Sequence, residues 1–167
     1  MIRNIFLSNY IRKNVKKGLT IGNNCYIHSR VDFGSEPYLV TLGNNVRLTE
    51  GVRFVTHDGG VHVLRNMYPE LKYIDVFGKI VVGNNVHIGI NSIIMPGVKI
   101  GDNVVIGCGS IVTKSIPSNS VVAGVPARVI ETLDVYKDKT LAKCLYTHHL
   151  SSKEKRNCLL ENEKNHK

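Results

Sequence analysis

Residues 82–112 read VGNNVHIGINSIIMPGVKIGDNVVIGCGSIV, and an aliphatic residue returns at every sixth position of this stretch. The positions that share this spacing are Val82, Ile88, Ile94, Ile100, Ile106 and Val112. A period of six matches neither the turn of an α-helix, about 3.6 residues, nor the simple alternation of an exposed strand. Fixed hexapeptide periodicity is typical of a parallel β-helix, in which three short strands and three corners complete one triangular turn.

The residues between these aliphatic positions suit the corners of such a coil. Gly-Asn-Asn or Gly-Asp-Asn occurs four times, beginning at Gly22, Gly43, Gly83 and Gly101. Gly, Asn and Asp tolerate the backbone conformations that tight corners require. The fifth residues of the hexads are small or β-branched and are expected to fill the inner corners: Val86, Ser92, Val98, Val104, Ser110 and Ile116. An ordinary all-β domain is the alternative, but its strands would not keep one phase over six hexads.

The same six-residue spacing of buried-type residues appears in the N-terminal half of the chain, with two interruptions. The earlier positions are Ile21, Ile27, Leu42, Leu48 and Phe54. A spacing of fifteen rather than twelve after Ile27 predicts a short insertion over 32–38. A spacing of 28 before Val82, which is 22 more than one hexad, predicts a loop at 58–79. Long loops within compact domains are usually either functional or disordered, and the apolar content of this one predicts packing against a neighbouring subunit.

With 167 residues, the chain is expected to form one domain with a helix at each end. We predict an N-terminal helical cap over 1–18, a β-helix catalytic domain over 19–130, and a C-terminal helix and basic tail over 131–167. The cap would cover the open end of the coil. Weak contact of this basic, apolar segment with an anionic membrane surface is a second interpretation. Within the tail, a helix is expected over 132–150 and disorder after it.

The net charge of +9 and the four cysteines limit the function classes. A basic chain suggests nucleic-acid binding, but the basic residues gather at the two ends without interleaved aromatic residues. We therefore predict no nucleic-acid partner; solvated termini, or a positive field for an anionic substrate, are the two interpretations. The cysteines form no CxxC pair, and Cys25 and Cys108 occupy hexad positions that suit small buried side chains. Without a membrane-length apolar run or signal peptide, a reducing, cytoplasmic location is expected.

Among the seven histidines, His57 has the most informative position. It lies in Phe54-Val55-Thr56-His57-Asp58-Gly59-Gly60, where a rigid strand ends and the long loop begins. A neutral imidazole anchored there suits the removal of a hydroxyl proton near neutral pH. A structural histidine is the alternative on placement alone.

Three segments together resemble the hexapeptide-repeat acyltransferases, in particular maltose/galactoside O-acetyltransferases of surface-polysaccharide synthesis. The segments are Thr56-His57-Asp58-Gly59, the hexads of 82–112, and the closing VTKSIP (112–117) with VAGVPARVI (122–130). The resemblance covers about 19–130. It implies a left-handed β-helix, a homotrimer with active sites between subunits, and acetyl-CoA as donor without a metal. The left-handed sense of the β-helix is implied by the family alone, because general rules favour right-handed crossovers between parallel strands.

The resemblance also implies roles for individual residues. His57 would be the general base that activates an acceptor hydroxyl for direct attack on the acetyl thioester. The pantetheine arm and nucleotide of the donor would contact Gly89, Gly107, Cys108, Thr113, Lys114, Ala123 and Arg128. For Lys114 and Arg128, exposed cations without a ligand are the alternative. Glu131 departs from the family pattern, in which a basic residue often stands there.

The acceptor is expected to contact the long loop and one strand. The expected residues are Asp58, His62, Arg65, Tyr68 and His87. At His87, relatives often carry an aromatic residue, commonly Trp, so its imidazole would alter acceptor packing, bond the substrate or face solvent.

The resemblance favours transfer of an acetyl group to a hydroxyl of a sugar, a surface polysaccharide or a lipopolysaccharide precursor. Three alternatives remain at this point. They are N-acetylation of an amino sugar, a γ-carbonic-anhydrase-like metal enzyme with His57, His62 and His87 as zinc ligands, and a non-catalytic trimeric scaffold.

Overall fold

A computed structural model describes residues 9–164 of the chain. The chain divides into two compact units, Met1–Tyr136 and Lys137–Lys167, and each is described by itself. The part of the expected N-terminal cap that falls on residues 1–8 lies outside the described residues.

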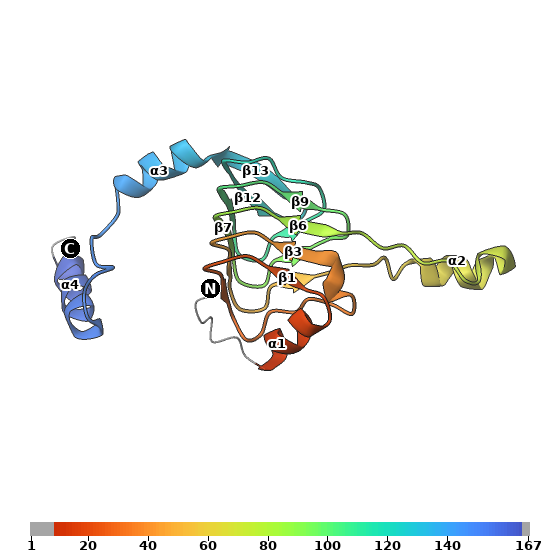
Figure 1. The fold of residues 1–167 in the computed structure, drawn as a ribbon. Helices are drawn as coiled ribbons and strands as arrows, with labels where there is room; N and C mark the ends of the chain where they lie inside the picture. Colours follow the sequence, from red (N-terminus) through yellow and green to blue (C-terminus); the bar gives the residue numbers. More distant parts are fainter. Residues whose placement is uncertain (1–8, 165–167) are drawn as a thin grey trace. The chain divides into compact units, whose positions relative to one another are not determined.

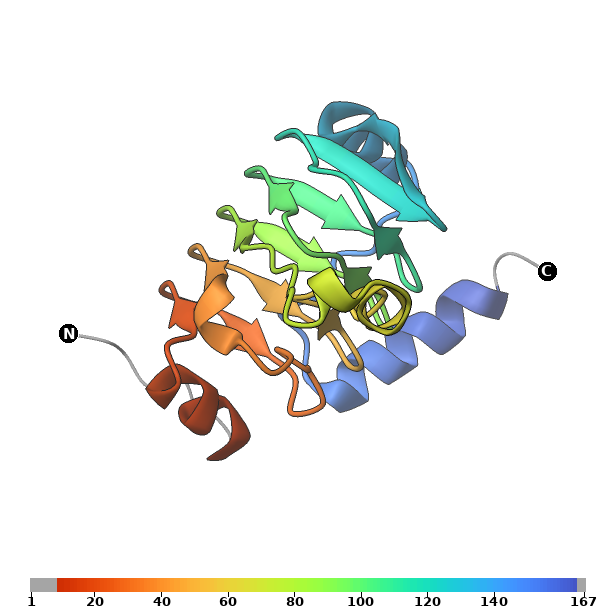
Figure 2. The same cartoon turned by 90° about the vertical axis from the view of Figure 1, so that its right-hand side faces the viewer.

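The first unit is a β-helix with three sheets (Figures 1 and 2). Sheet A contains β1 (Thr20–Ile21), β3 (Val40–Leu42), β6 (Ile80–Val82) and β9 (Lys99–Ile100). Sheet B contains β2 (Tyr26–Ile27), β4 (Arg47–Leu48), β7 (Val86–Ile88), β10 (Val104–Ile106), β12 (Ser120–Gly124) and β13 (Ala127–Thr132). Sheet C contains β5 (Arg53–Phe54), β8 (Ile93–Ile94) and β11 (Ile111–Val112). These strands pair in parallel except β13, which returns antiparallel to β12 and ends the sheet.

The strand register confirms the hexapeptide phase. Ile88 is paired with Ile106, three hexads further along the chain, so three hexads complete one turn. Leu42 is paired with Ile21 below it and with Val82 above it. The coil therefore resumes in phase after both the insertion and the long loop.

The core of the coil is aliphatic. The inward residues Leu42, Leu48, Ile88, Ile94 and Ile106 are each at most 1% exposed, and the fifth residues of the hexads are also buried. Their burial supplies the main driving force for this fold. Two of those fifth residues are serines, and Ser92 and Ser110 both donate to the carbonyl oxygen of Gly107, which satisfies their buried hydroxyl groups.

The Gly-Asn-Asn motifs form a ladder at the corner between sheets A and B. The ladder residues Asn24, Asn45, Asn85, Asn103 and Asn119 all have positive φ, between 54° and 60°. The Asn103 amide accepts from Asn85 Nδ2 and donates to Asn119 Oδ1, both at 2.9 Å. Asn tolerates this left-handed conformation better than most residues, which explains why it recurs. The preceding glycines permit close stacking, since a Cβ on Gly43 would lie 2.5 Å from the Gly83 carbonyl oxygen.

At the N-terminal end of the coil lies α1 (Asn9–Lys16), next to β1 (Figure 1). Ile11 on this helix is 1% exposed and belongs to the core cluster. Asn14 is buried as well, where its side chain donates to the Tyr10 carbonyl oxygen.

The loop at 58–79 leaves the coil as an arm with its own helices (Figure 1). It contains α2 (Val61–Met67) and the 3-10 helix η2 (Pro69–Leu71). The hexad spacing predicted this loop but not α2. Gly60 before α2 and Pro69 after it are ordinary helix boundary signals.

The expectation of one helix over 132–150 followed by disorder is wrong. Instead, α3 (Leu133–Leu141) crosses the boundary between the units, and α4 (Ser152–Lys164) lies in the second unit. Ser151 and Glu154 explain the start of α4, because Glu154 Oε2 accepts from the Ser151 amide at 2.9 Å and the Ser151 hydroxyl accepts from the Glu154 amide. This is a capping box. None of the helices in the described part of the chain is long and apolar enough to cross a membrane.

Candidate active site

His57 lies three residues after Phe54, at the corner between sheets C and A. The base of the arm holds this corner, because the backbone amide of Gly78 donates to the Thr56 carbonyl oxygen and the backbone amide of Asp58 donates to the Val76 carbonyl oxygen, both at 2.9 Å. The Phe77 ring meets the His57 ring edge-on, with centroids 6.2 Å apart. The imidazole is thus fixed by a rigid corner, while 45% of its side chain remains exposed.

The insertion over 32–38 brings Glu36 to His57. Phe33 occupies an inward hexad position and stacks on Phe54, with ring centroids 5.2 Å apart. The extra residues therefore fold over the same corner, one turn below His57. Glu36 Oε2 lies 3.2 Å from His57 Nδ1 and accepts a 2.6 Å hydrogen bond from the buried Thr56 hydroxyl. No motif in the sequence predicted this contact, although the hexad count places the insertion beneath Thr56 and His57.

The contacts of Glu36 determine which nitrogen of the His57 imidazole carries no proton. The hydrogen bond from Thr56, followed by weaker contributions from Ser35 and His57, holds the pKa of Glu36 below its usual value despite burial. An ionised carboxylate only accepts hydrogen bonds, so His57 Nδ1 must carry the proton that faces it. In a neutral imidazole, Nε2 is then the unprotonated nitrogen. This arrangement suits a general base whose charged form the carboxylate would stabilise.

A cavity of about 340 Å³ adjoins the imidazole. Its lining residues are Ser35, Glu36, His57, Asp58, Gly59, Val61, Arg65, Asp75 and Phe77. Two expected acceptor residues, Asp58 and Arg65, lie here. However, Arg65 is engaged within the arm, where it forms an ion pair with Asp75 and donates to the Ile74 carbonyl oxygen. Its immediate role is to hold the arm.

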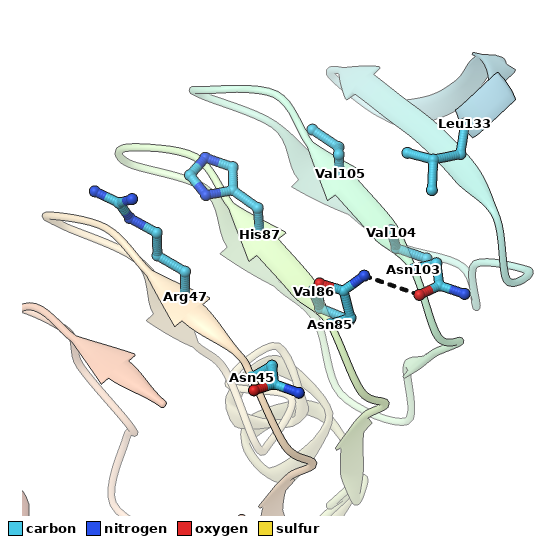
Figure 3. A pocket seen from close by; sticks show the side chains of 9 residues that line it. All are labelled: Asn45, Arg47, Asn85, Val86, His87, Asn103, Val104, Val105 and Leu133. Atoms are coloured by element: carbon cyan, nitrogen blue, oxygen red, sulfur yellow. Dashed lines mark hydrogen bonds between the residues drawn. The ribbon is translucent and has the colours of Figure 1, made fainter. Parts of the chain in front are cut away.

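The other expected acceptor residues lie elsewhere in the subunit. His62 lies on α2 with its Nε2 3.1 Å from Asn66 Nδ2, and Tyr68 ends the same helix; neither lines the His57 cavity. His87 lies on β7, and its side chain points outward from sheet B into a separate groove (Figure 3). One subunit therefore does not gather all five residues around His57.

Six of the seven expected donor-binding residues lie at two corners, and Arg128 lies on β13. Gly89, Gly107 and Ala123 stack at the corner between sheets B and C, and a Cβ on Gly107 would lie 2.9 Å from the Ala123 Cβ. These glycines thus have a packing role irrespective of any ligand. Cys108 is exposed, contrary to the expectation of burial, because it follows the inward Ile106 by two positions and points outward. Cys25 is the fifth residue of the hexad that begins at Ile21, and it is buried as expected.

The remaining expected donor-binding residues are polar and exposed. Thr113 and Lys114 follow β11 at the corner between sheets C and A, two turns of the coil beyond His57. Arg128 lies on β13 and donates to its neighbouring Ala127 carbonyl oxygen. Two cations at this end of the coil suit phosphate groups.

The three-histidine zinc site considered from the sequence is not formed within one subunit. Residues 9–164 contain no group of three His, Cys, Asp or Glu side chains placed to hold a metal ion.

A coil of hexapeptide repeats with a carboxylate-paired imidazole beside a cavity is the arrangement expected of a transferase of the hexapeptide class. The family described as "Bacterial transferase hexapeptide (six repeats)" matches residues 79–114. Protein CapG of Staphylococcus aureus is 54% identical over 147 residues, which are 87% of this chain and 84% of that protein.

Solved structures show the same relationship. A galactoside acetyltransferase in complex with coenzyme A is 33% identical with a TM-score of 0.62, over 87% of this chain and 80% of that one. A hexapeptide-repeat acetyltransferase of Vibrio cholerae complexed with acetyl-coenzyme A is 28% identical with a TM-score of 0.59, over 68% of this chain and 59% of that one. The chain belongs to the hexapeptide-repeat transferase family, and it is an acetyltransferase of that family.

Proposed function

We propose that this enzyme transfers the acetyl group of acetyl-CoA to a hydroxyl of a sugar that forms part of a surface polysaccharide or its precursor. The observation that carries the proposal is the Glu36–His57 pair at a 340 Å³ cavity. It supplies an oriented base, and a galactoside acetyltransferase solved in complex with coenzyme A has a similar fold. The left-handed sense of the coil is inferred from the same relatives.

The chemistry requires one base and no acyl-enzyme. His57 Nε2 takes the proton of the acceptor hydroxyl as its oxygen attacks the thioester carbonyl carbon. The tetrahedral intermediate then collapses with cleavage of the C–S bond, and the departing thiolate takes the proton back from the imidazolium. Glu36 stabilises that imidazolium through Nδ1, and holding both substrates together supplies the proximity contribution.

For the donor, we propose a path along the far turns of the coil. The pantetheine arm would follow the surface formed by Gly89, Gly107, Cys108 and Ala123, where short side chains leave the backbone accessible. Thr113, Lys114 and Arg128 would contact the nucleotide end, where Lys114 and Arg128 supply charge for its phosphates. No metal is required by this scheme. Acetyl-CoA is an intracellular donor, so the proposal includes a cytoplasmic site of action.

We propose a homotrimer whose arms contact neighbouring subunits. The arm carries large exposed apolar side chains that the coil of its own subunit does not cover; Met67 is 62%, Tyr73 87% and Phe77 52% exposed. Such a concentration on one projecting segment favours a protein interface. A trimer would also allow His87 of one subunit to approach the His57 cavity of another, which one subunit does not achieve.

The proposal is tested by following coenzyme A release with a panel of acceptors. The panel contains neutral sugars, amino sugars, uronic acids and sugar nucleotides, each assayed with acetyl-CoA, and product NMR then locates the new acetyl group. We expect coenzyme A to be released faster with the correct acceptor than without any acceptor, and the product to carry an O-acetyl ester. An acetamide in the product would instead identify an N-acetyltransferase, and release that no acceptor stimulates would contradict sugar acetylation.

A further inference from the structure

The outer face of sheet B carries a second groove, of about 250 Å³, that shares no lining residue with the His57 cavity. It lies across β4, β7 and β10, beside the asparagine ladder (Figure 3). Ladder residues Asn45, Asn85 and Asn103 form its polar side, and Val105 and Leu133 form its apolar side. The groove therefore offers both hydrogen bonds and apolar contact.

Arg47 and His87 dominate the chemistry of this groove. They are register partners on adjacent strands, so their side chains project side by side from the same face of the sheet (Figure 3). Neighbouring strands lie about 4.8 Å apart. A single ligand group can thus contact both. Arg47 also lies over the Tyr26 ring, 5.2 Å from its centroid, which holds the guanidinium in place at the edge of the groove.

The groove has positive charge and no acidic lining residue in the part of the chain that the structure describes. Burial and the charge of Arg47 lower the pKa of His87, so its imidazole is neutral near pH 7. A neutral imidazole can both donate to and accept from a hydroxyl group. The groove thus combines one permanent cation, one imidazole for hydroxyl groups, and side-chain amides. A polyhydroxylated molecule with one anionic group matches this set.

We propose that the groove formed by Arg47 and His87 binds the anionic group, a carboxylate or a phosphate, of a saccharide acceptor. Arg47 contacts the anionic group and His87 contacts an adjacent hydroxyl. This assignment rests on the proposed sugar acetylation, because that function makes a saccharide the expected occupant. In the proposed trimer, the groove of one subunit and His57 of another serve the same acceptor.

The test measures binding without catalysis, so that it succeeds or fails independently of acetyl transfer. Calorimetric titrations use methyl glucuronide, its uncharged methyl ester and glucose 1-phosphate, with the full chain carrying His57→Ala and no acetyl-CoA. We expect the acid or the phosphate to bind at least about tenfold more tightly than the ester, because charge-assisted hydrogen bonds are the stronger ones. Higher salt should weaken that binding.

Two arginine variants locate the contact. Arg47→Gln should remove the preference for the anionic saccharide, an effect of about tenfold or more. Arg53→Gln is the matched control, since Arg53 lies one hexad later at the equivalent outward position and lines a different hollow. It should leave binding unchanged.

The outcomes decide the proposal in either direction. Preference for glucuronide identifies a carboxylate acceptor, and preference for the phosphate identifies a sugar phosphate; both support the proposal. Equal binding of acid and ester, an equal effect of the two arginine variants, or no binding of either anionic saccharide would overturn it. A third result would also overturn the proposal. If coenzyme A displaced the bound saccharide and Arg47→Gln weakened the binding of coenzyme A as well, the groove would belong to the donor. Proposed sugar acetylation would survive these failures, because neutral acceptors test it separately.

Discussion

His57 and Glu36 come from different turns of the coil, and a three-residue excess in one hexad spacing brings them together. The sequence identified His57 because a histidine at the junction of strand and loop has an obvious chemical use. Glu36 carried no such signal by itself. The hexad count puts the insertion one turn below His57, and the stacking of Phe33 under Phe54 shows that it folds over this corner.

Glu36→Gln should slow acetyl transfer by about 10- to 100-fold. The change removes the charge that stabilises the imidazolium, and a hydrogen bond to a charged group contributes about 1.5–3 kcal/mol. The KM for acetyl-CoA should change little, because Glu36 lies one turn below His57 whereas the proposed donor contacts Thr113 and Lys114 lie two turns beyond it. Steady-state kinetics measure both constants. A variant with unchanged kcat would contradict the role of Glu36.

Glu36 should also make stability depend on pH. Its pKa is lower in the folded protein than in the unfolded chain, so it stabilises the fold fully above its unfolded pKa, about 4.3. That contribution is lost as the pH falls from there through the lower folded pKa. Chemical unfolding of wild type and Glu36→Gln should differ at pH 6–8 and still differ at pH 5. The two curves should converge only as the pH falls below about 4.3. Glu70→Gln, on the exposed η2, is the control and should show no such change.

At the scale of elements, the asparagine ladder and its glycines account for the regular stacking of turns. The hexad phase predicted which residues face inward and how the strands pair, because burial and register repeat every turn. The same phase could not predict the helices of the arm and of the second unit. Those depend on local signals, such as Gly60 and Pro69 around α2 and the Ser151–Glu154 capping box of α4.

Gly43→Ala should destabilise the coil by roughly 1–3 kcal/mol, the usual range for overpacking. The added methyl would lie 2.5 Å from a backbone oxygen of the next turn, which cannot move independently. Gly59→Ala is the matched control, since its Cβ would meet no atom within 4 Å. Urea unfolding of both variants gives the free-energy differences, and equal values would contradict the stacking argument.

The exposed apolar side chains of the arm lead to a separate prediction about assembly. Replacing Met67 and Tyr73 with Ser should weaken self-association without lowering the stability of the coil, because both side chains are exposed in the single subunit. Sedimentation velocity over a concentration series measures the association, and far-UV circular dichroism checks the fold. A trimer that persists unchanged would mean that the arm does not form the interface.

At the scale of the whole molecule, the fold and family follow from the sequence more completely than the site does. Hexads are local and repetitive, so one chain suffices to define the coil. The expected acceptor residues are different: His57 and His87 face separate hollows of one subunit. Their proposed cooperation depends on neighbouring chains, which no pattern in a single sequence places.

The most direct measurement is a single-turnover assay of acetyl transfer from labelled acetyl-CoA to the best acceptor of the panel, comparing wild type with His57→Ala. Thermal melts and sedimentation of both proteins confirm equal folding and assembly. The variant should transfer acetyl about 10²- to 10⁴-fold more slowly, the usual contribution of a general base. Transfer at the wild-type rate by a correctly assembled His57→Ala enzyme would contradict the account.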